Sequence, residues 1–169
     1  MSQPYLHGQT ALVTGASSGL GSEFARQLAQ QGCRLILTAR RAERLSALQQ
    51  DLQSQFGCEA AAIPCDLADP SGPQALYDAV TVLGWPVDIL VNNAGIIRRT
   101  AALDYSAVDW EATLQINLNS VFFLAQAAAR VMMQQPITNG FRGKIIQVAS
   151  VLAFQGDIRG PAYTAAKHA

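Results

Sequence analysis

The chain has 169 residues, of which 50% are hydrophobic and 14% are charged. This length suits one domain with a substantial core, and the composition excludes a disordered protein. Lysine plus arginine and aspartate plus glutamate number twelve each, so the formal net charge is zero and gives no reason to expect a nucleic acid or an anionic membrane as partner.

The N-terminal sequence and the cysteines predict a cytoplasmic protein without a bound metal. The start, "MSQPYLHGQT", lacks the basic and apolar regions of a signal peptide and the features of a transit sequence. No apolar run approaches the length of a bilayer span. Cys33, Cys58 and Cys65 are odd in number and lack CxxC spacing, so we expect reduced thiols that act as small hydrophobic residues.

Short apolar runs alternate with longer segments of helical periodicity along the chain. The predicted strands are 10–15, 34–39, 59–65, 87–93 and 143–150. The predicted helices are 19–32, 41–57, 69–84, 104–135 as two helices run together, and one that begins at 160. In the first helix, Leu20, Phe24, Leu28 and Ala29 recur at helical spacing.

This alternation predicts an α/β protein with a Rossmann-like, doubly wound parallel sheet. Strands that are hydrophobic on both faces are typical of a parallel sheet covered by helices on both sides. Short connections between the elements favour right-handed crossovers and a sheet of five strands. Segment 136–143 is predicted to be a surface turn with Asn139-Gly140 at its tightest point.

The first strand ends in "TGASSGLG" (14–21), which places Gly15, Gly19 and Gly21 at the junction with the first helix. Glycine there permits positive φ and close approach of a ligand to the backbone, and the amino end of a helix favours an anion. Glycines also occur in ordinary turns. Here the strand-turn-helix context, with the spacing GxxxGxG, favours binding of a dinucleotide diphosphate.

The end of the second strand favours NADP over NAD. At this place, NAD-binding folds usually carry an acidic residue that binds the ribose 2′-hydroxyl. This chain has Arg40 and Arg41 instead, with no acid until Glu43, and an arginine can pair with a 2′-phosphate. The alternative is that both arginines are solvated residues at the start of a helix.

Six motifs in this order resemble those of the short-chain dehydrogenase/reductase family, and they extend over essentially the whole chain. They are "TGASSGLG" (14–21), "CDLAD" (65–69), "NNAG" (92–95), "NLNSVFF" (117–123), Ser150 and "YTAAK" (163–167). The resemblance implies an oxidoreductase that transfers a hydride between NAD(P) and a carbonyl or secondary alcohol.

The resemblance also implies two sets of site residues. The catalytic set would be Asn117, Ser150, Tyr163 and Lys167. The cofactor contacts would be Gly15, Ser17, Ser18, Gly19, Leu20, Gly21, Arg40, Asp66, Leu67, Asn93, Ala94, Gly95, Tyr163 and Lys167. Within this set, Asp66 would contact the adenine and Lys167 would hold the nicotinamide ribose.

Physical chemistry supports the catalytic roles independently. Residues four apart on a helix share a face, with Cβ atoms roughly 5–6 Å apart, so Tyr163 and Lys167 can project into one cleft. A nearby ammonium commonly lowers the pKa of a phenol, ordinarily about 10, by about 1–3 units, which suits proton transfer to a carbonyl oxygen. The hydroxyl of Ser150, at the end of the fifth strand, could hold the substrate oxygen. A Tyr-x-x-x-Lys pair alone would also fit an ordinary helix surface.

Within the family, "NNAGIIRR" (92–99), "SVFFLAQAAA" (120–129) and "SVLAFQGDIRGPAYTAAK" (150–167) most resemble sugar-acid dehydrogenases such as 2-deoxy-D-gluconate 3-dehydrogenase and gluconate 5-dehydrogenase. Arg98, Arg99 and Arg159 fall in loops at the cleft end of the sheet, where one or more could bind a substrate carboxylate. The alternative is that they are solvated or face a partner subunit.

The resemblance implies that related enzymes continue beyond the catalytic lysine with the rest of that helix and two more strands. We therefore expect 1–169 to be one dinucleotide-binding domain that is incomplete at its C-terminal side, weakly active or inactive alone, and derived from an active homo-oligomeric parent. The competing class is a non-catalytic dinucleotide-binding or interaction protein on the same fold. A Tyr163→Phe variant distinguishes the two classes.

Overall fold

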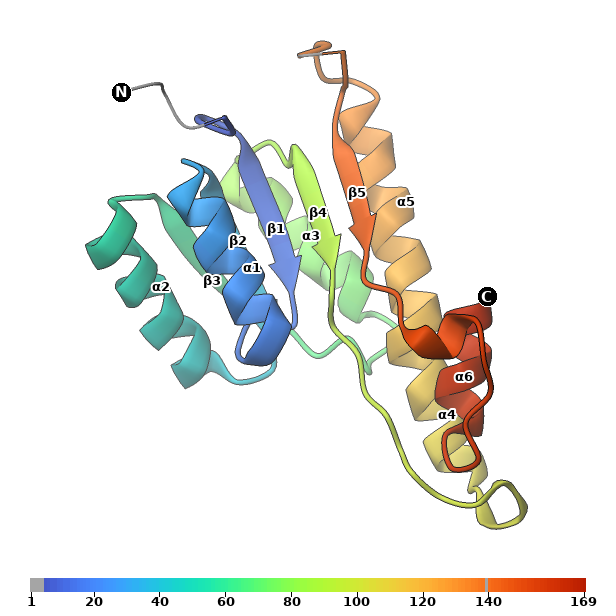
Figure 1. Ribbon diagram of the computed structural model, residues 1–169. Coiled ribbons are helices and arrows are strands. Elements are labelled where there is room, and N and C mark those ends of the chain that lie inside the picture. Colours follow the sequence, from blue (N-terminus) through green and yellow to red (C-terminus); the bar gives the residue numbers. More distant parts are fainter. Residues whose placement is uncertain (1–4, 139) are drawn as a thin grey trace.

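A computed structural model describes residues 5–138 and 140–169. Its centre is a sheet of five parallel strands, β1 Thr10–Thr14, β2 Arg34–Ala39, β3 Ala60–Pro64, β4 Ile89–Asn92 and β5 Lys144–Gln147. The strand order is β3-β2-β1-β4-β5 (Figure 1). The chain winds outward from β1 to β3, returns to place β4 on the other side of β1, and ends the sheet with β5.

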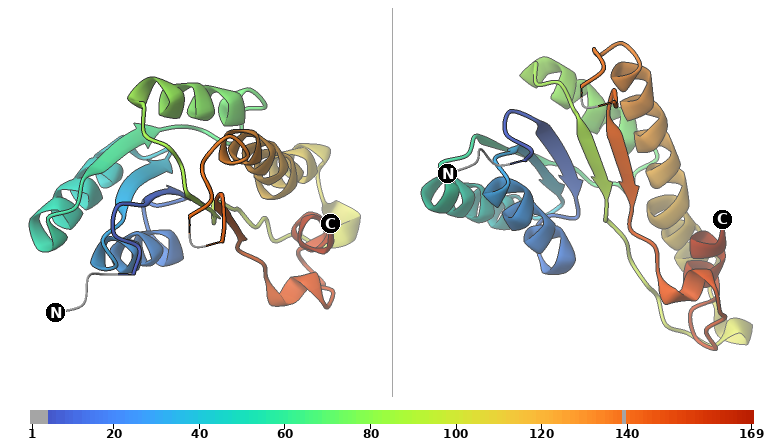
Figure 2. Two further views of the ribbon diagram at one scale, coloured as in Figure 1. Left: turned by 90° about the horizontal axis from the view of Figure 1, so that it is seen from above. Right: turned by 45° about the horizontal axis from the view of Figure 1, so that its top comes forward.

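Helices cover both faces of this sheet, which confirms the predicted doubly wound fold (Figure 2). The α-helices are α1 Gly19–Gln30, α2 Ala42–Phe56, α3 Gly72–Leu83, α4 Ala107–Leu114, α5 Ser120–Met132 and α6 Pro161–His168. Helices α1 and α2 lie on one face, and α3 and α5 lie on the other. Helices α4 and α6 contact each other beyond the carboxyl ends of β4 and β5.

The core has two halves because alternate residues of a strand face opposite sides of the sheet. In β1, Ala11 and Val13 contact the cluster under α1 and α2, whereas Leu12 contacts the cluster under α3 and α5. Ile36 of β2 and Leu90 of β4 join Leu12. Full burial of each such leucine or isoleucine side chain contributes about 1.5–3 kcal/mol.

Helix α1 approaches the sheet through small residues, which differs from the apolar spacing in the sequence. Of the four residues at helical spacing, only Ala29 is fully buried, and Leu20 is 63% exposed. The other buried positions of α1 are Gly21 and Ala25. At Gly21 a Cβ would lie 2.3 Å from the carbonyl oxygen of Gly15, so no larger side chain fits there, and Phe24 and Leu28 pack against the core only in part.

Two connections illustrate how the predicted segments fold. The predicted pair of helices within 104–135 is confirmed, and α4 and α5 join through a π-helical segment, Gln115–Asn119. In the predicted turn, Thr138 and Phe141 exchange backbone hydrogen bonds of 2.8 and 3.1 Å. Asn139, predicted as part of its tightest point, lies outside the described residues.

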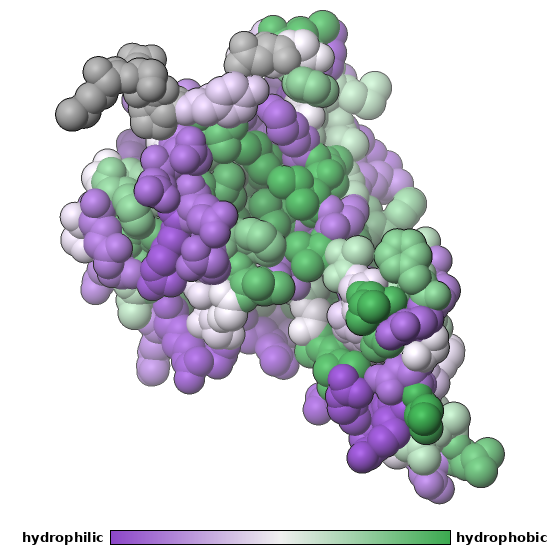
Figure 3. Space-filling model, viewed as in Figure 1, coloured by the Kyte–Doolittle hydropathy of each residue, from purple (hydrophilic) through white to green (hydrophobic). Residues whose placement is uncertain are grey.

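The face of β4 and β5 beside α1 exposes apolar side chains (Figure 3). A groove of about 230 Å³ runs there between Phe24 and Leu28 of α1 and Val91 and Ile146 of the sheet. Within the described residues, β5 is an edge strand, and Ile145 and Ile146 are 37% and 45% exposed. An exposed apolar edge of this kind favours association with another strand.

The buried thiol of Cys33 predicts a loss of stability at alkaline pH. Burial, with a further contribution from the charge of Asp88, raises the pKa of the Cys33 thiol from 9.0 to about 11. The unfolded chain therefore loses this proton first, and the free energy of unfolding falls as the pH rises from about 9 to about 11. We expect Cys33→Ala to lose correspondingly less stability over this pH range in urea denaturation. Equal losses in both proteins would contradict the assignment.

Candidate active site

The turn between β1 and α1 has a backbone that requires glycine. Gly15 and Gly19 have φ values of +67° and +59°, in the left-handed region. A Cβ on Gly15 would lie 2.9 Å from the Cα of Ala94, and a Cβ on Gly21 would lie 2.3 Å from the carbonyl oxygen of Gly15. The turn is therefore held closely between α1 and the loop after β4, with the free N–H groups of the helix start beside it.

A cleft of about 360 Å³ opens at the carboxyl ends of β1 to β4, where the strand order reverses. In doubly wound sheets, ligands bind at this point. Predicted cofactor residues that line the cleft are Gly15, Ser17, Ser18, Leu20, Arg40, Asp66, Leu67, Asn93, Ala94 and Gly95. Gly19 and Gly21 shape the turn without lining the cleft, and Tyr163 and Lys167 lie outside the lining.

Further lining residues escaped the sequence prediction. They are Ala39, Cys65, Ile96 and Ile116. All but Ile116 lie at or just beyond the carboxyl end of a strand, so the rule that ligands bind at strand ends could have found them. Ile116 lies in the π-helical segment and not at a strand end, so its position next to the predicted site residue Asn117 was the one signal in the sequence for it. Arg41, which the sequence suggested together with Arg40 as a partner for a 2′-phosphate, also lines the cleft.

Arg41 holds its guanidinium against the glycine-rich turn. Its Nη2 donates to Ser18 Oγ at 2.7 Å and to Ser17 Oγ at 2.9 Å. Arg40 lines the same cleft at the end of β2. Two arginines therefore lie in the cleft at the end of β2, close to the glycine-rich turn. A phosphate bound there could contact both the turn and a guanidinium.

The loop after β4 is tied to β1 by half-buried hydrogen bonds. Thr14 Oγ1 accepts from the backbone N–H groups of Asn93 at 3.0 Å and Ala94 at 2.9 Å. Asn93 Nδ2 donates to the carbonyl oxygen of Thr14 at 2.9 Å, and Asn92 Nδ2 donates to a carbonyl of α5 at 3.1 Å. These bonds hold the loop after β4, which lines the cleft, against β1 and α5.

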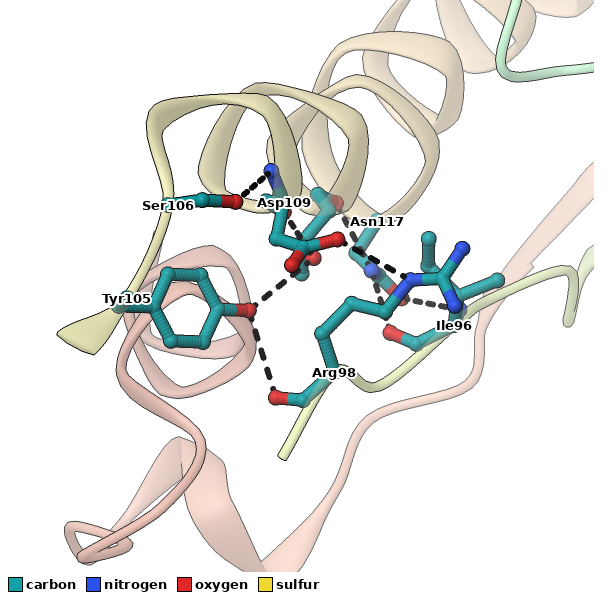
Figure 4. Close-up of polar contacts among 7 residues, drawn as sticks. Ile96, Arg98, Tyr105, Ser106, Asp109 and Asn117 are labelled. Atoms are coloured by element: carbon teal, nitrogen blue, oxygen red, sulfur yellow. Dashed lines mark hydrogen bonds and ion pairs between the residues drawn. The ribbon is translucent and has the colours of Figure 1, made fainter. Parts of the chain in front are cut away.

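Asn117 lies buried in the π-helical segment, and its side chain holds the next part of this loop (Figure 4). Its Oδ1 accepts from the N–H of Ile96 at 3.2 Å. Its Nδ2 donates to the carbonyl oxygens of Ile96 and Thr113, each at 2.8 Å. Gly95 is needed here because a Cβ would lie 2.7 Å from Asn117 Oδ1. A π-helical segment often marks a functional site, and this one places Ile116 in the cleft lining and Asn117 against Ile96, which also lines the cleft.

Ser150, Tyr163 and Lys167 lie on the segments that follow β5. Strand β5 ends earlier than predicted, and Ser150 begins the helical turn Val151–Ala153, where its Oγ accepts from the N–H of Leu152 at 3.2 Å. Lys167 Nζ donates to the carbonyl oxygen of Val148 at 2.7 Å and lies 5.7 Å from the centroid of the Tyr163 ring. Burial lowers the pKa of the Lys167 ammonium. The expected shared face of Tyr163 and Lys167 is present.

The three arginines suggested by the sequence lie in neighbouring loops and contact acidic residues. Arg98 Nε lies 3.6 Å from Asp109 Oδ1, and Arg99 Nη1 lies 2.8 Å from Asp157 Oδ2. The backbone N–H of Arg159 donates to Asp157 Oδ1 at 3.2 Å. A substrate carboxylate would have to compete with Asp109 for Arg98 and with Asp157 for Arg99.

Over residues 5–138 and 140–169, no helix is both long enough and apolar enough to cross a membrane. The same residues contain no group of three or more His, Cys, Asp and Glu side chains arranged to hold a metal ion.

The sequence matches known proteins over nearly its whole length. The family model described as short chain dehydrogenase matches residues 9–169. The 2-dehydro-3-deoxy-D-gluconate 5-dehydrogenase of Dickeya dadantii (strain 3937) is 40% identical over an alignment of 169 residues. The alignment covers 97% of this chain and 62% of that protein.

Two solved structures share the fold. One, from Agrobacterium tumefaciens, is assigned provisionally as a 2-deoxy-D-gluconate 3-dehydrogenase and has bound NADP; it is 42% identical, with a TM-score of 0.83 over 99% of this chain and 63% of that one. The other is L-sorbose reductase of Gluconobacter frateurii with NADPH and L-sorbose, which is 27% identical, with a TM-score of 0.89 over 99% of this chain and 62% of that one. The chain thus spans about three fifths of the length of these proteins. It belongs to the short-chain dehydrogenase family.

Proposed function

We propose that this chain forms the cofactor-binding and catalytic part of an NADP-dependent oxidoreductase that interconverts a carbonyl and a secondary alcohol on a sugar acid. One observation carries the proposal: Lys167 lies beside Tyr163 and is anchored to the segment that leads to Ser150. These groups share the carboxyl end of the sheet with the glycine-rich cleft. A dinucleotide site beside a phenol and an ammonium suits hydride transfer coupled to proton transfer.

The side chains then have distinct roles. The cofactor, when bound, supplies or accepts the hydride. The Tyr163 hydroxyl donates a proton to the carbonyl oxygen in reduction and accepts it from the alcohol in oxidation. The Lys167 ammonium, 5.7 Å from the centroid of the Tyr163 ring, would hold the nicotinamide ribose, and the Ser150 hydroxyl holds the substrate oxygen. Asn117 keeps the Ile96 loop in place at the cleft.

The arginines at the end of β2 support NADP as the cofactor. Arg41 already bonds two hydroxyls of the turn, and a 2′-phosphate could accept from the same guanidinium. The bound NADP and NADPH in the two similar structures agree with this choice. NAD carries no 2′-phosphate on its adenosine ribose, so it would give the two arginines no phosphate to bind.

We expect Arg41→Ala to weaken NADPH binding by about tenfold and to leave NADH binding within about twofold, because only NADPH carries the 2′-phosphate. Titration of both cofactors by calorimetry measures the two affinities. Arg44→Ala removes an exposed arginine one turn further along α2, outside the cleft lining, and is the matched control. A uniform loss for both cofactors would contradict a 2′-phosphate contact.

A sugar acid is the proposed substrate because arginines cluster around the loops at the open end of the cleft. The names of the Dickeya dadantii relative and of the Agrobacterium tumefaciens structure support this class. Of the three arginines, we select Arg159 for the substrate carboxylate, since Arg98 and Arg99 already face carboxylates.

Steady-state assays test the substrate class. The polypeptide encoded by the complete reading frame is assayed with D-gluconate-type acids and with D-glucitol, which replaces the carboxylate by an alcohol. We expect kcat/KM to be at least about tenfold higher for the acids, and Arg159→Ala to remove this preference. Arg44→Ala should retain it. Equal kcat/KM for acids and uncharged polyols in the unmodified enzyme would refute the sugar-acid proposal.

The proposal treats 1–169 as one dinucleotide-binding domain of a cytoplasmic enzyme that forms homo-oligomers. Phe122 and Phe123 on α5 are 58% and 51% exposed and form an edge-to-face pair with ring centroids 5.4 Å apart. Aromatic side chains of this kind are enriched at subunit interfaces. Sedimentation of the polypeptide encoded by the complete reading frame measures the oligomeric state.

A further inference from the structure

Ser120 joins two walls of the cleft through one buried hydroxyl. It is the first residue of α5 and is fully buried. Its Oγ donates to the carbonyl oxygen of Leu67 at 2.7 Å and accepts from Gln115 Nε2 at 3.1 Å. Because the amide group of Gln115 donates a hydrogen bond to this oxygen, the Ser120 hydroxyl proton points to the carbonyl oxygen of Leu67. The hydroxyl therefore ties the loop after β3 to the π-helical segment.

The loop held by Ser120 is the loop proposed to receive the adenine. Asp66 and Leu67 both line the cleft, and Asp66 Oδ1 accepts from the N–H of Ala68 at 2.9 Å, which closes the loop on itself. Ile116 of the π-helical segment lines the same cleft. The adenine side and the π-helical segment therefore form a continuous wall.

The other end of this wall holds the loop after β4. Asn117 follows Ile116 directly and bonds both the N–H and the carbonyl oxygen of Ile96 (Figure 4). The Ser120–Leu67 bond at one end of the helical segment and the two Asn117–Ile96 bonds at the other are buried or half-buried and are 3.2 Å or shorter. Short polar contacts across one helical segment can transmit a restriction from one loop to the other.

We propose that Ser120 is a positioning residue that couples binding of the adenine half of the cofactor to the ordering of Asn117 and the Ile96 loop. The inference rests on the proposed function because it requires a dinucleotide in the cleft. Adenine bound against Asp66 and Leu67 restricts the motion of the loop after β3. The hydrogen bond between Ser120 and Leu67 then restricts the motion of the π-helical segment as well. The loop beside the reacting groups is then ordered before substrate enters.

Hydrogen exchange at the Ile96 amide tests this coupling without any turnover. The probe is adenosine 2′,5′-bisphosphate, the adenine half of NADP, at saturation on the 169-residue chain. In the unmodified chain we expect the ligand to slow exchange of the Ile96 N–H by about threefold or more. In Ser120→Ala we expect the Kd for the ligand to rise about three- to tenfold and the slowing to disappear even at saturation.

Two further variants make the result specific. Gln115→Ala removes the donor that orients the Ser120 hydroxyl and should reduce the slowing in the same direction, which keeps the proposal testable if Ser120→Ala fails to fold. Ser54→Ala is the matched control, since Ser54 Oγ donates to a carbonyl of its own helix, Asp51, at 3.0 Å on the exposed side of α2. It should behave as the unmodified chain does.

Undiminished slowing of Ile96 exchange in Ser120→Ala or, where that variant does not fold, in Gln115→Ala would overturn the coupling, whatever happens to the Kd. If Ser120→Ala had the same Kd for the bisphosphate as the unmodified chain and the same slowing of Ile96 exchange, Ser120 would have no role in cofactor binding or in the coupling. Failure of the unmodified chain to bind the bisphosphate would be a failure of the proposed function itself, and the inference would fall with it. The three outcomes are distinguishable because the unmodified chain is measured first.

Discussion

Replacing Tyr163 with phenylalanine is expected to lower turnover by about 10²–10⁴-fold, the usual contribution of a positioned general acid or base. The substitution removes only the hydroxyl and leaves the ring beside Lys167, whose Nζ lies 5.7 Å from the ring centroid. Binding of NADPH should therefore stay within about twofold of the unmodified value. Turnover is measured on the polypeptide encoded by the complete reading frame, and binding is measured by calorimetry.

Tyr5→Phe is the control for this prediction, because Tyr5 is 77% exposed and outside the cleft lining. It should change neither turnover nor binding. If Tyr163→Phe also left both unchanged, the protein would fit the alternative class, a non-catalytic dinucleotide-binding protein on the same fold. Lost turnover with retained binding is the result that favours an enzyme.

Gly21→Ala is expected to destabilise the fold and to impair cofactor binding together. A Cβ at this position would lie 2.3 Å from the carbonyl oxygen of Gly15 and 2.6 Å from Asn93 Nδ2. Helix α1 must then move away from the turn, at a cost of about 1–3 kcal/mol in the free energy of unfolding. The same movement displaces the N–H groups proposed to bind the diphosphate, so the Kd for NADPH should rise at least about tenfold.

Urea denaturation and cofactor titration measure these two effects of Gly21→Ala. The matched control is Gly156→Ala, because a Cβ on Gly156 would meet no atom within 4 Å and should cost little. A Gly21→Ala variant with unaltered stability and unaltered affinity would show that α1 and the turn are not held as closely as the structure indicates.

The sequence predicted the fold well because its signals are local. Strands that are apolar on both faces, with a helical pattern after each, are enough to indicate a parallel doubly wound sheet. The glycine spacing at 15, 19 and 21 likewise reports a local backbone requirement, and the structure has positive φ at Gly15 and Gly19. The small contact face of α1 was not predictable, because Gly21 and Ala25 carry no apolar signal comparable with Leu20.

The parts of the site that the sequence could not predict depend on contacts between distant segments. Arg99 pairs with Asp157 across 58 positions of the chain, and no periodicity reports such a pair. The choice between Arg40 and Arg41 as the residue that meets the turn depends on side-chain direction, and Arg41 makes the contacts with Ser17 and Ser18. The π-helical turn at Asn117 depends on hydrogen bonding that amino-acid spacing alone does not reveal.

Binding of NADPH to the 169-residue chain tests the central claim most directly, since everything proposed for the site requires a dinucleotide in this cleft. Titration calorimetry should give saturable binding of one NADPH per chain, displaced by adenosine 2′,5′-bisphosphate and tighter than binding of NADH. A folded chain that shows no saturable NADPH binding, or that binds it without competition from the bisphosphate, would contradict the account.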